Sequence, residues 1–564
     1  WNSVIEKSAA ENLATSKGET WHFGSLMCLC HEKHAELFRP DHLKEYKVRI
    51  VFRGDLMRDE SGYLAVLSEQ GTSASHIEAV KMMDAIARLN LDDEECDGED
   101  ADAVGAYTQA DLGGPPTWIT VPKEYWPSWW FGKFEKPVVR LLRNLYGHPL
   151  AGLYWQQHSQ QALFSLGWEL VKGWESLYKH TTSQLFLSVY VDDFKMAGRK
   201  SSIKPMWEKI RSVLDIDPPQ HITEGTYLGC RQKEFEVDAQ IQSLIDHRRP
   251  LITRCLQLGH QSSQGGDNIQ ENDTDIPDTD PTPAMRGVGA TMFSKISNSG
   301  KYDGNDGTAD TVHSTCKFRA ADTAQVPPYQ EVPRSSTARD NDDHHTIHPK
   351  AEANMHIKNM KHNMSPKCWE YNMCGHAKSA VEKYLKLAKI DEKSLRKVAT
   401  PCIDDHQLSD EDFRNQGLLN SIASHVVLTC LYLARHNRPD ILWSVNHLAR
   451  NITKWTLADD KRLHRLISYL HHTQHFVQIC FAGDKLKDCF LVMYVDAGFA
   501  GDLTDCKSTG GSMVFLVGPS TCIPISWTCK KQGAVSHSST EAEIISLDMG
   551  LRMQGIPALE LWDE

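Results

Sequence analysis

The hydrophobic pattern is most informative at residues 185–198, LFLSVYVDDFKMAG. Two apolar runs flank a short polar tip, which predicts a β-hairpin. The tip carries two adjacent carboxylates, Asp192 and Asp193. Neighbouring strand residues point to opposite faces, so a tight turn is needed for both to stand beside one cation. Carboxylates at the end of a buried hairpin are costly without a positive partner, which favours Mg²⁺; a solvated turn is the alternative.

Two segments that precede this hairpin also show regular patterns. Residues 46–54, YKVRIVFRG, alternate apolar side chains with Lys47, Arg49 and Arg53, which predicts a strand with one basic face. Residues 72–91 place apolar side chains at helical spacing and predict an amphipathic helix.

Residues 418–473 predict three helices with a break at the Arg-Pro-Asp sequence that begins at Arg438. The basic side chains of this stretch either follow a phosphate backbone or form an ordinary solvated helix face. They are Arg435, Arg450, Lys454, Lys461, Arg462 and Arg465.

A second acidic strand is predicted at residues 489–499, CFLVMYVDAGF. Its carboxylate, Asp496, lies inside an apolar run, which indicates either a metal site or a satisfied hydrogen bond. Two further strands and a helix follow, and Ser539 or Thr540 is a suitable N-cap for that helix.

The composition is that of a globular protein. Of 564 residues, 40% are hydrophobic and 24% are charged, enough for several domains. Fifteen cysteines without a paired framework predict reduced thiols and an intracellular protein, in the cytoplasm or the nucleus. No apolar run reaches the length of a membrane span, so no membrane partner is expected. Because the chain begins with Trp1 rather than Met, we expect a fragment of a longer protein.

The net charge of −13 weighs against nucleic-acid binding, but its distribution matters more than its sign. Residues 91–103 hold eight acids and no base, and residues 261–350 hold fourteen acids and eight bases. The remaining chain is close to neutral and is compatible with a local basic channel. The polar composition predicts a flexible linker over 261–365.

The sequence from Tyr190 to Asp193 resembles the active-site box of reverse transcriptases, and its surroundings resemble the Pol polyproteins of copia-type LTR retrotransposons. The other segments occur in the order of that family. They are the basic strand, the DAVGAY box at 102–107, the LYG…W segment at 145–155, YVDAGFAGD at 494–502 and STEAE at 539–543.

This resemblance implies an α+β fold, with a right-hand palm and fingers polymerase, a helical connection and a partial ribonuclease H-like α/β domain. The implied divisions are 1–45 as a flanking segment, 46–260 as the reverse transcriptase with fingers, palm and a thumb-like part, 261–365 as the linker, 366–480 as the connection and 481–564 as a truncated ribonuclease H-like domain.

For the polymerase, the resemblance assigns the catalytic, metal-binding carboxylates to Asp102, Asp192 and Asp193. The cofactor would be Mg²⁺, with Mn²⁺ as an alternative, in a two-metal nucleotidyl transfer.

Nucleotide binding is implied at five other positions. The resemblance assigns the triphosphate to the basic strand, without choosing among its three cations, which are Lys47, Arg49 and Arg53. Tyr107 corresponds to the aromatic residue that excludes a ribose 2′-hydroxyl. Leu150 stands where the family usually has a Gln that helps to hold the nucleotide, which predicts weaker binding.

For the nuclease, Asp496 corresponds to the first metal carboxylate. Glu541 and Glu543 both qualify as the helix carboxylate, and Glu543 is favoured because apolar residues follow it. Such nucleases need a further carboxylate on a later strand. The chain ends at Glu564 before that strand, so ribonuclease H activity is not expected from this fragment.

One departure concerns the strand that should precede Asp102. Residues 92–100, DDEECDGED, contain seven acids, and a central strand of this composition is costly to bury. The sequence therefore predicts that the strand begins only at about Ala101, or that this copy has decayed.

The expected function is an RNA-directed DNA polymerase of a copia-type retrotransposon, acting on an RNA template, a DNA primer and dNTPs. The alternative is a catalytically decayed remnant that folds and at most binds nucleic acid. The oligomeric state stays open.

Overall fold

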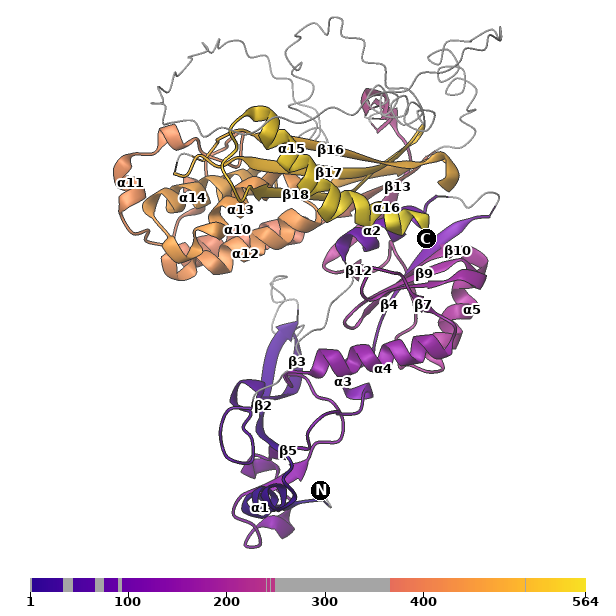
Figure 1. Cartoon of the computed structure of the whole chain (residues 1–564), viewed down its shortest axis with the longest axis vertical. Helices are drawn as coiled ribbons and strands as arrows, with labels where there is room; N and C mark the ends of the chain where they lie inside the picture. Colours follow the sequence, from indigo (N-terminus) through magenta and orange to yellow (C-terminus); the bar gives the residue numbers. More distant parts are fainter. Residues whose placement is uncertain are drawn as a thin grey trace, which may run out of the picture. The chain divides into compact units, whose positions relative to one another are not determined.

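Helices and three β-sheets make up an α+β fold in the computed structural model of the chain (Figure 1). The structure describes residues 3–33, 44–65, 76–89, 94–239, 241–243, 245–248, 366–502 and 504–564. The predicted linker, 261–365, lies outside these residues. Among the helices of the described residues, none is long and apolar enough to cross a membrane.

The first sheet has five strands in the order β1-β6-β5-β2-β3. They are β1 (Ile5–Glu6), β6 (Pro137–Arg140), β5 (Thr117–Thr120), β2 (His22–Lys33) and β3 (Glu45–Phe52). Helix α1 (Lys7–Lys17) buries Ala10 and Ala14 against this sheet. Strands β2 and β3 pair as a ribbon, in which Lys47 lies opposite His31 and Arg49 opposite Leu29. Because side chains alternate along a strand, Lys47 and Arg49 share one face of the ribbon.

The second sheet has six strands in the order β11-β4-β10-β9-β8-β7. They are β11 (Gln220–His221), β4 (Cys96–Asp102), β10 (Asp193–Arg199), β9 (Leu185–Tyr190), β8 (Leu177–His180) and β7 (Glu169–Leu170). Strands β9 and β10 confirm the predicted hairpin. Helices α4 (Ala151–Ser165) and α5 (Lys200–Arg211) cover one face, where Trp155 and Trp207 pack with Leu187 and Phe194.

The prediction that the acidic strand begins only at about Ala101 is wrong, because β4 begins at Cys96. Three features lower the free-energy cost of burying the strand from Cys96 onward. Cys96 and Gly98 occupy buried positions, Asp97 lies 2.9 Å from His221 Nε2, and Asp100 lies 3.4 Å from the ammonium of Lys195. The strand therefore buries small residues and places a positive or hydrogen-bonding partner beside Asp97 and Asp100.

The third sheet has seven strands in the order β12-β13-β14-β15-β18-β17-β16. They are β12 (Thr226–Tyr227), β13 (Cys230–Phe235), β14 (Lys367–Asn372), β15 (Gln478–Ala482), β18 (Thr521–Lys531), β17 (Thr509–Gly518) and β16 (Phe490–Gly498). Strand β13 pairs with β14, and β15 pairs with β18. The predicted domain boundaries at 260 and 480 stay predictions, but this one sheet contains residues from both sides of each.

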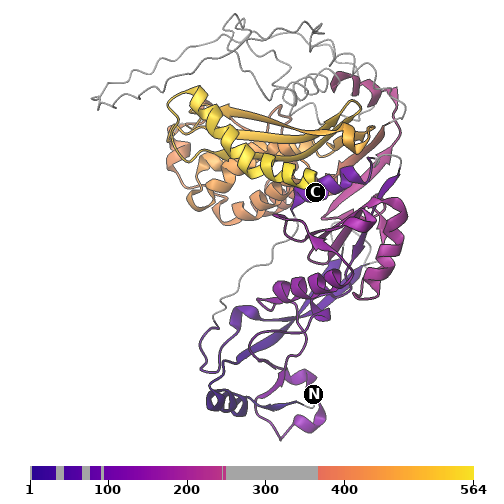
Figure 2. The ribbon, with the colours of Figure 1, turned by 45° about the vertical axis from the view of Figure 1, so that its right-hand side comes forward.

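Helices lie on both faces of this sheet. One group consists of α10 (Cys374–Ala388), α11 (Asp410–Arg414), α12 (Asn420–His436), α13 (Leu442–Arg450) and α14 (Leu457–His472). The three helices predicted at 418–473 are α12, α13 and α14. Met513 of β17 and Trp527 of β18 face this group. Helix α15 (Ser539–Gly550) runs across β16 and β17 on the other face, where a Cβ at Gly510 would collide with Ser546 (Figures 1 and 2).

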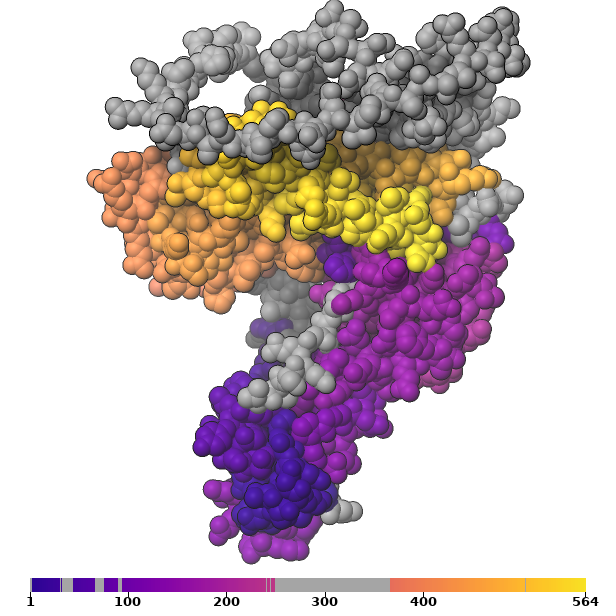
Figure 3. Space-filling view, in the orientation of Figure 1, coloured from indigo at the N-terminus to yellow at the C-terminus, as the bar shows by residue number. Residues whose placement is uncertain are grey.

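A π-helical turn (Leu551–Gly555) joins α15 to α16 (Ile556–Asp563). In Figure 3 the yellow C-terminal residues lie against the magenta residues of the second sheet, where Lys179 of β8 forms an ion pair with Glu564. The C-terminal helix thus contacts the sheet that contains the hairpin.

Helix α2 (Ile77–Ile86) confirms the core of the helix predicted at 72–91 and packs between the second and third sheets. It buries charged side chains there. Lys195 Nζ of β10 lies 2.7 Å from Asp84 Oδ1 of α2, and both side chains are 1% exposed. The hydroxyl of Tyr371, on β14, donates to Asp84 Oδ2 at 3.0 Å. A single carboxylate therefore connects α2 to both sheets.

The charges in this cluster depend on each other. Burial opposes the charge of Lys195, but Asp100 and Asp84 outweigh that effect and raise its pKa. Burial also raises the pKa of Asp100 to about 6, although the ammonium of Lys195 favours its ionised form. Removing the lysine would leave two buried carboxylates without a counter-charge.

We expect Lys195→Met to lower the free energy of unfolding by about 3–5 kcal/mol, because it breaks a buried ion pair from one side. Adding Asp84→Asn and Asp100→Asn should recover a large part of this loss, since both uncompensated charges are then removed. Urea denaturation of the single and triple variants at neutral pH measures the difference. A triple variant no more stable than Lys195→Met would contradict this account.

A second buried lysine, Lys81 of α2, donates to Gln478 Oε1 at 2.8 Å and stands 3.8 Å from the centre of the Trp527 ring. Burial lowers the pKa of Lys81 to about 8. The unfolded chain has an ordinary lysine pKa of about 10.4, so between about pH 8 and that value the unfolded state binds more protons. Stability contributed by this site therefore rises with pH over that interval.

We expect the native chain to gain up to about 3 kcal/mol of stability relative to Lys81→Met as the pH rises from about 8 to about 10.4. Other groups titrate alike in both chains, so their contributions cancel in the difference. Unfolding free energies of the two chains at several pH values test this. A difference that stays constant with pH would show that Lys81 does not titrate in this interval.

Candidate active site

Two of the predicted polymerase carboxylates face each other across neighbouring strands. Asp193, the first residue of β10, lies directly opposite Asp102, the last residue of β4. Their side chains form a hydrogen bond, and Asp192 is close enough to interact electrostatically with both. The antiparallel register thus brings Asp102 together with Asp192 and Asp193, which lie about ninety residues later in the sequence.

The turn that carries Asp192 is held by two hydrogen bonds to its carbonyl groups. The indole Nε1 of Trp155, on α4, donates to the Val191 carbonyl at 2.5 Å, and the Ala103 amide donates to the Asp192 carbonyl at 2.7 Å. Val191 has a φ of 58°, which is rare for a β-branched residue. Such backbone strain persists only where the surroundings fix it, and here α4 and β4 do so.

The electrostatics of the acidic group favour protonation. Burial and the neighbouring charges of Asp102 and Asp192 raise the pKa of Asp193 to about 7. Burial likewise raises the pKa of Asp102. Two carboxylates this close disfavour simultaneous ionisation without a compensating charge, so the pair favours holding a proton.

Aromatic and basic residues stand next to the acids. Tyr107 of α3 (Ala106–Gln109) packs edge-on against Tyr146 with ring centroids 4.7 Å apart. The guanidinium of Arg49 lies 5.7 Å from the centre of the Tyr146 ring. Lys47 interacts electrostatically with Asp102, and Asp192 raises the pKa of Tyr107 together with burial. The ribbon face that carries Lys47 and Arg49 therefore points toward the acids.

Two other predicted residues are placed differently. Arg53 forms an ion pair with Asp55 at 3.1 Å, so a carboxylate already engages it. Leu150 is buried directly before α4 and donates its amide to His148 Nδ1 at 3.3 Å. The structure therefore selects Lys47 and Arg49 from the three basic candidates as those beside the acids.

The donor set at Asp102, Asp192 and Asp193 consists of carboxylate oxygens, which are the ligands that Mg²⁺ prefers. The raised pKa values of Asp102 and Asp193 mark a place where a positive charge would be favourable. Nevertheless, the described residues contain no group of three or more His, Cys, Asp or Glu side chains arranged to hold a metal ion. The chemistry of the donors fits Mg²⁺, while their arrangement is that of two paired carboxylates with a third nearby.

The second acidic site is not assembled in the same way. Asp496 lies opposite Gly511, on the face of the sheet that Met513 turns toward α10–α14. Helix α15 packs on the opposite face, and its Glu541 accepts from the His537 amide at 2.6 Å as part of the N-terminal cap. Glu543 is exposed. The structure therefore does not bring Asp496 together with either glutamate.

Sequence reasoning missed Lys195, which lies two residues from Asp193 on the same face of β10. The signal was a lysine inside the apolar run FKMAG, because a charged residue in a buried strand requires a partner. Its partner on α2, Asp84, has no recognisable motif. Tyr146 was missed as well, although it is part of the LYG segment.

No protein-family model matches the chain. A segment of 122 residues is 38% identical to the retrovirus-related Pol polyprotein from transposon RE1 of Arabidopsis thaliana, covering 22% of this chain and 8% of that protein. Parts of the chain are thus similar to the retrovirus-related Pol polyproteins of transposons. A further member, from transposon TNT 1-94 of Nicotiana tabacum, is 29% identical over 172 residues, which are 29% of this chain and 12% of the relative.

The likeness to this family is therefore partial, because the matches span 8% and 12% of the lengths of these polyproteins. A third relative, named secreted RxLR effector protein 161 of Plasmopara viticola, is 35% identical over 118 residues, which are 21% of this chain and 78% of that protein. What its name says about secretion concerns that protein alone. The shared segments are similar to parts of proteins that are named as transposon Pol polyproteins.

The Trp155 bond gives a direct test of how the acidic turn is held. Trp155→Phe should lower the free energy of unfolding by about 1–2 kcal/mol more than Trp168→Phe, because it leaves the Val191 carbonyl without its partner. Trp168 is a matched control, since it is equally buried and its Nε1 has no hydrogen-bond partner. Equal losses in the two variants, measured by urea denaturation, would contradict a supporting role for this bond.

Proposed function

We propose that the chain is an RNA-directed DNA polymerase of a copia-type retrotransposon. The second sheet with α2, α4 and α5 would be the palm of a right-hand polymerase, and the β2–β3 ribbon would belong to the fingers. The observation that carries the proposal is the pairing of Asp102 with Asp193 beside the turn that carries Asp192. The partial similarity to relatives that are named as Pol polyproteins adds support.

In this proposal Asp102, Asp192 and Asp193 hold Mg²⁺, or Mn²⁺ in its place. The bound ions would lower the pKa of the primer 3′-hydroxyl and stabilise the charge on the leaving pyrophosphate. The protein contributes the positions of the three carboxylates, because the β4–β10 register and the turn fix them before a nucleotide arrives.

The nucleotide would lie between these acids and the ribbon. Lys47 and Arg49 face the acids and would neutralise the triphosphate of an incoming dNTP. The Tyr107 ring, fixed by its contact with Tyr146, would exclude a ribose 2′-hydroxyl. The partners would be an RNA template and a DNA primer.

A second candidate function is nucleic-acid binding without catalysis, as in a decayed element. Two observations favour it. The described residues contain no side-chain group of three or more arranged to hold a metal ion, and Leu150 replaces the expected Gln with a buried apolar side chain. For the second acidic site we propose no hydrolytic activity of this chain by itself, because Asp496 and the two glutamates lie apart.

Primer extension on a poly(rA)–oligo(dT) template with Mg²⁺ separates the two functions. We expect the native chain to extend the primer and Asp192→Asn/Asp193→Asn to lose at least about 100-fold in rate, because the cation loses charged ligands at the step where charge develops. Asp111→Asn, an exposed carboxylate outside the site, serves as the matched control and should extend at the native rate.

Absence of extension by a folded native chain that still binds the template would favour the binding-only function. Extension that persists in the double variant would show that these carboxylates are not the catalytic ones.

A further inference from the structure

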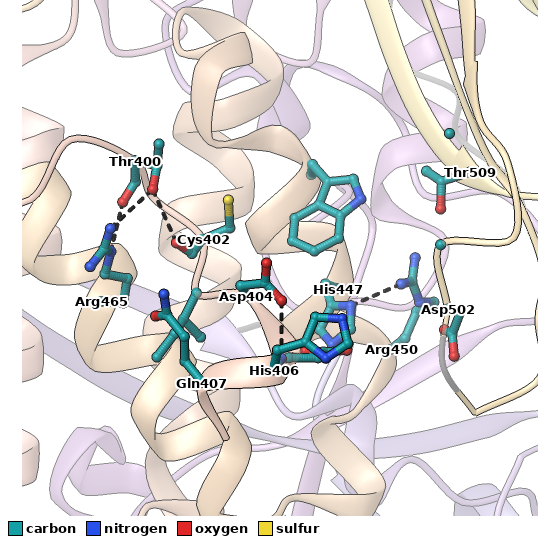
Figure 4. Close-up of a pocket in the computed structure, with 15 residues that line it drawn as sticks. Thr400, Cys402, Asp404, His406, Gln407, His447, Arg450, Arg465, Asp502 and Thr509 are labelled. Atoms are coloured by element: carbon teal, nitrogen blue, oxygen red, sulfur yellow. Dashed lines mark hydrogen bonds between the residues drawn. The ribbon is translucent and has the colours of Figure 1, made fainter. Parts of the chain in front are cut away.

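A cavity of about 430 Å³ lies apart from the acidic hairpin. Residues 400–407 form one wall, α13 and α14 supply the basic wall, and the ends of β16 and β17 close it with Gly498 and Thr509 (Figure 4). The volume suits a single nucleotide, since small-molecule sites begin at about 300 Å³. Neither the polymerase proposal nor the comparisons assign a function to this cavity.

Two guanidinium groups line the cavity with neutral partners only. Arg465 donates to the carbonyl and the hydroxyl of Thr400 at 2.9 and 3.0 Å. Arg450 lies 3.3 Å from His447 Nδ1, as the dashed line in Figure 4 shows. Among the described residues, neither arginine forms an ion pair with a carboxylate. Both charges are therefore available to an anionic ligand.

The acids of the cavity are largely engaged elsewhere. Asp405 pairs with Arg462, and Asp502 pairs with Lys531, which holds the pKa of Asp502 below its usual value despite partial burial. Asp404 accepts from the His406 amide at 3.0 Å and remains an acid of the wall. Arg462 is shared with Asp459, and Lys531 is shared with Asp505. The cations of the lining without a carboxylate partner among the described residues are therefore Arg450 and Arg465.

An aromatic surface stands beside the arginines. The Trp443 ring is stacked on the His447 ring with centroids 5.3 Å apart and an interplanar angle of 29°. Trp443 nevertheless remains 41% exposed. The stacking fixes the indole, and its free face offers a flat apolar platform. An ordered aromatic platform next to two guanidinium groups is the combination that binds a base and its phosphate.

We propose that this cavity binds one nucleotide of a single-stranded nucleic acid, with the base stacked on Trp443 and the phosphates held by Arg450 and Arg465. The choice of a nucleic-acid strand rests on the proposed function, while the ligand chemistry, a nucleoside phosphate, rests on the cavity alone. Asp496 shares a face of β16 with Gly498, so a bound strand would pass beside the second acidic site.

Binding of fluorescein-labelled (dT)12 to the full chain tests the arginines. We expect Arg450→Gln/Arg465→Gln to weaken binding at least about tenfold and to reduce the slope of log affinity against log salt by about 1.4, since each phosphate contact contributes about 0.7. Arg231→Gln, an exposed arginine of β13 outside the cavity, should change the affinity less than about twofold. Arg450→Gln alone repeats the test without disturbing the loop that Arg465 holds.

The aromatic platform is tested by photocrosslinking. An oligonucleotide with one 5-iodouracil should crosslink to Trp443, identified by mass spectrometry of the tryptic peptides. Trp443→Leu should lose this crosslink and weaken binding, whereas Trp129→Leu, a comparably exposed tryptophan, should do neither. Unchanged affinities in the arginine and Trp443 variants, or crosslinks confined to other peptides, would overturn the proposal.

Competitors separate the sources of the ligand. Displacement of (dT)12 from the cavity by dTMP at equal concentration would overturn the assignment to a strand and leave a free-nucleotide site. The binding measurements on the cavity variants do not depend on polymerase activity. If the chain does not extend primers but the cavity variants lose binding, the cavity proposal stands and the polymerase proposal is rejected. If the chain extends primers and the cavity variants bind normally, only the cavity proposal is rejected.

Discussion

The buried pairing of Lys195 with Asp84 is the interaction on which the arrangement of the described residues depends. It places opposite charges at 2.7 Å where both side chains are 1% exposed, so each charge is tolerable only because the other is present. Asp84 also accepts from Tyr371 of the third sheet, and Lys195 belongs to the strand that carries Asp193. The same contact therefore fixes α2 between two sheets and holds the acidic strand in register.

This constraint explains how an unusually acidic strand can stand next to the proposed catalytic carboxylates. The ammonium of Lys195 offsets the charge of Asp100. Asp102 and Asp193 have no such ion pair among the described residues. Their mutual repulsion, together with burial, is the local condition that a divalent cation would relieve. The strained Val191 turn adds rigidity, because it presents Asp192 in one position beside them.

The proposed nucleotide cavity follows from how charges are partitioned among the helices. In the group α10–α14, Lys461 and Arg462 are engaged by carboxylates, whereas Arg450 and Arg465 have neutral partners. A cation that is paired with a carboxylate is less available to a ligand, because the ion pair must be broken before phosphate can bind. The cavity would therefore give the chain a nucleic-acid contact separate from the polymerase acids.

The sequence by itself determined the local elements and the resemblance to transposon Pol polyproteins, since periodicity, turn residues and short motifs are local properties. The hairpin at Asp192 and Asp193 and the basic strand with Lys47 could be predicted in this way. Only the tertiary structure decided which distant side chains meet. It paired Asp193 with Asp102, buried Lys195 beside an unmarked Asp84 and set Asp496 on the face away from α15. These outcomes depend on strand register and on the burial of charge, which are fixed when the sheets and helices pack together. A segment such as FKMAG can indicate that a lysine needs a partner, but it does not indicate which residue that partner is.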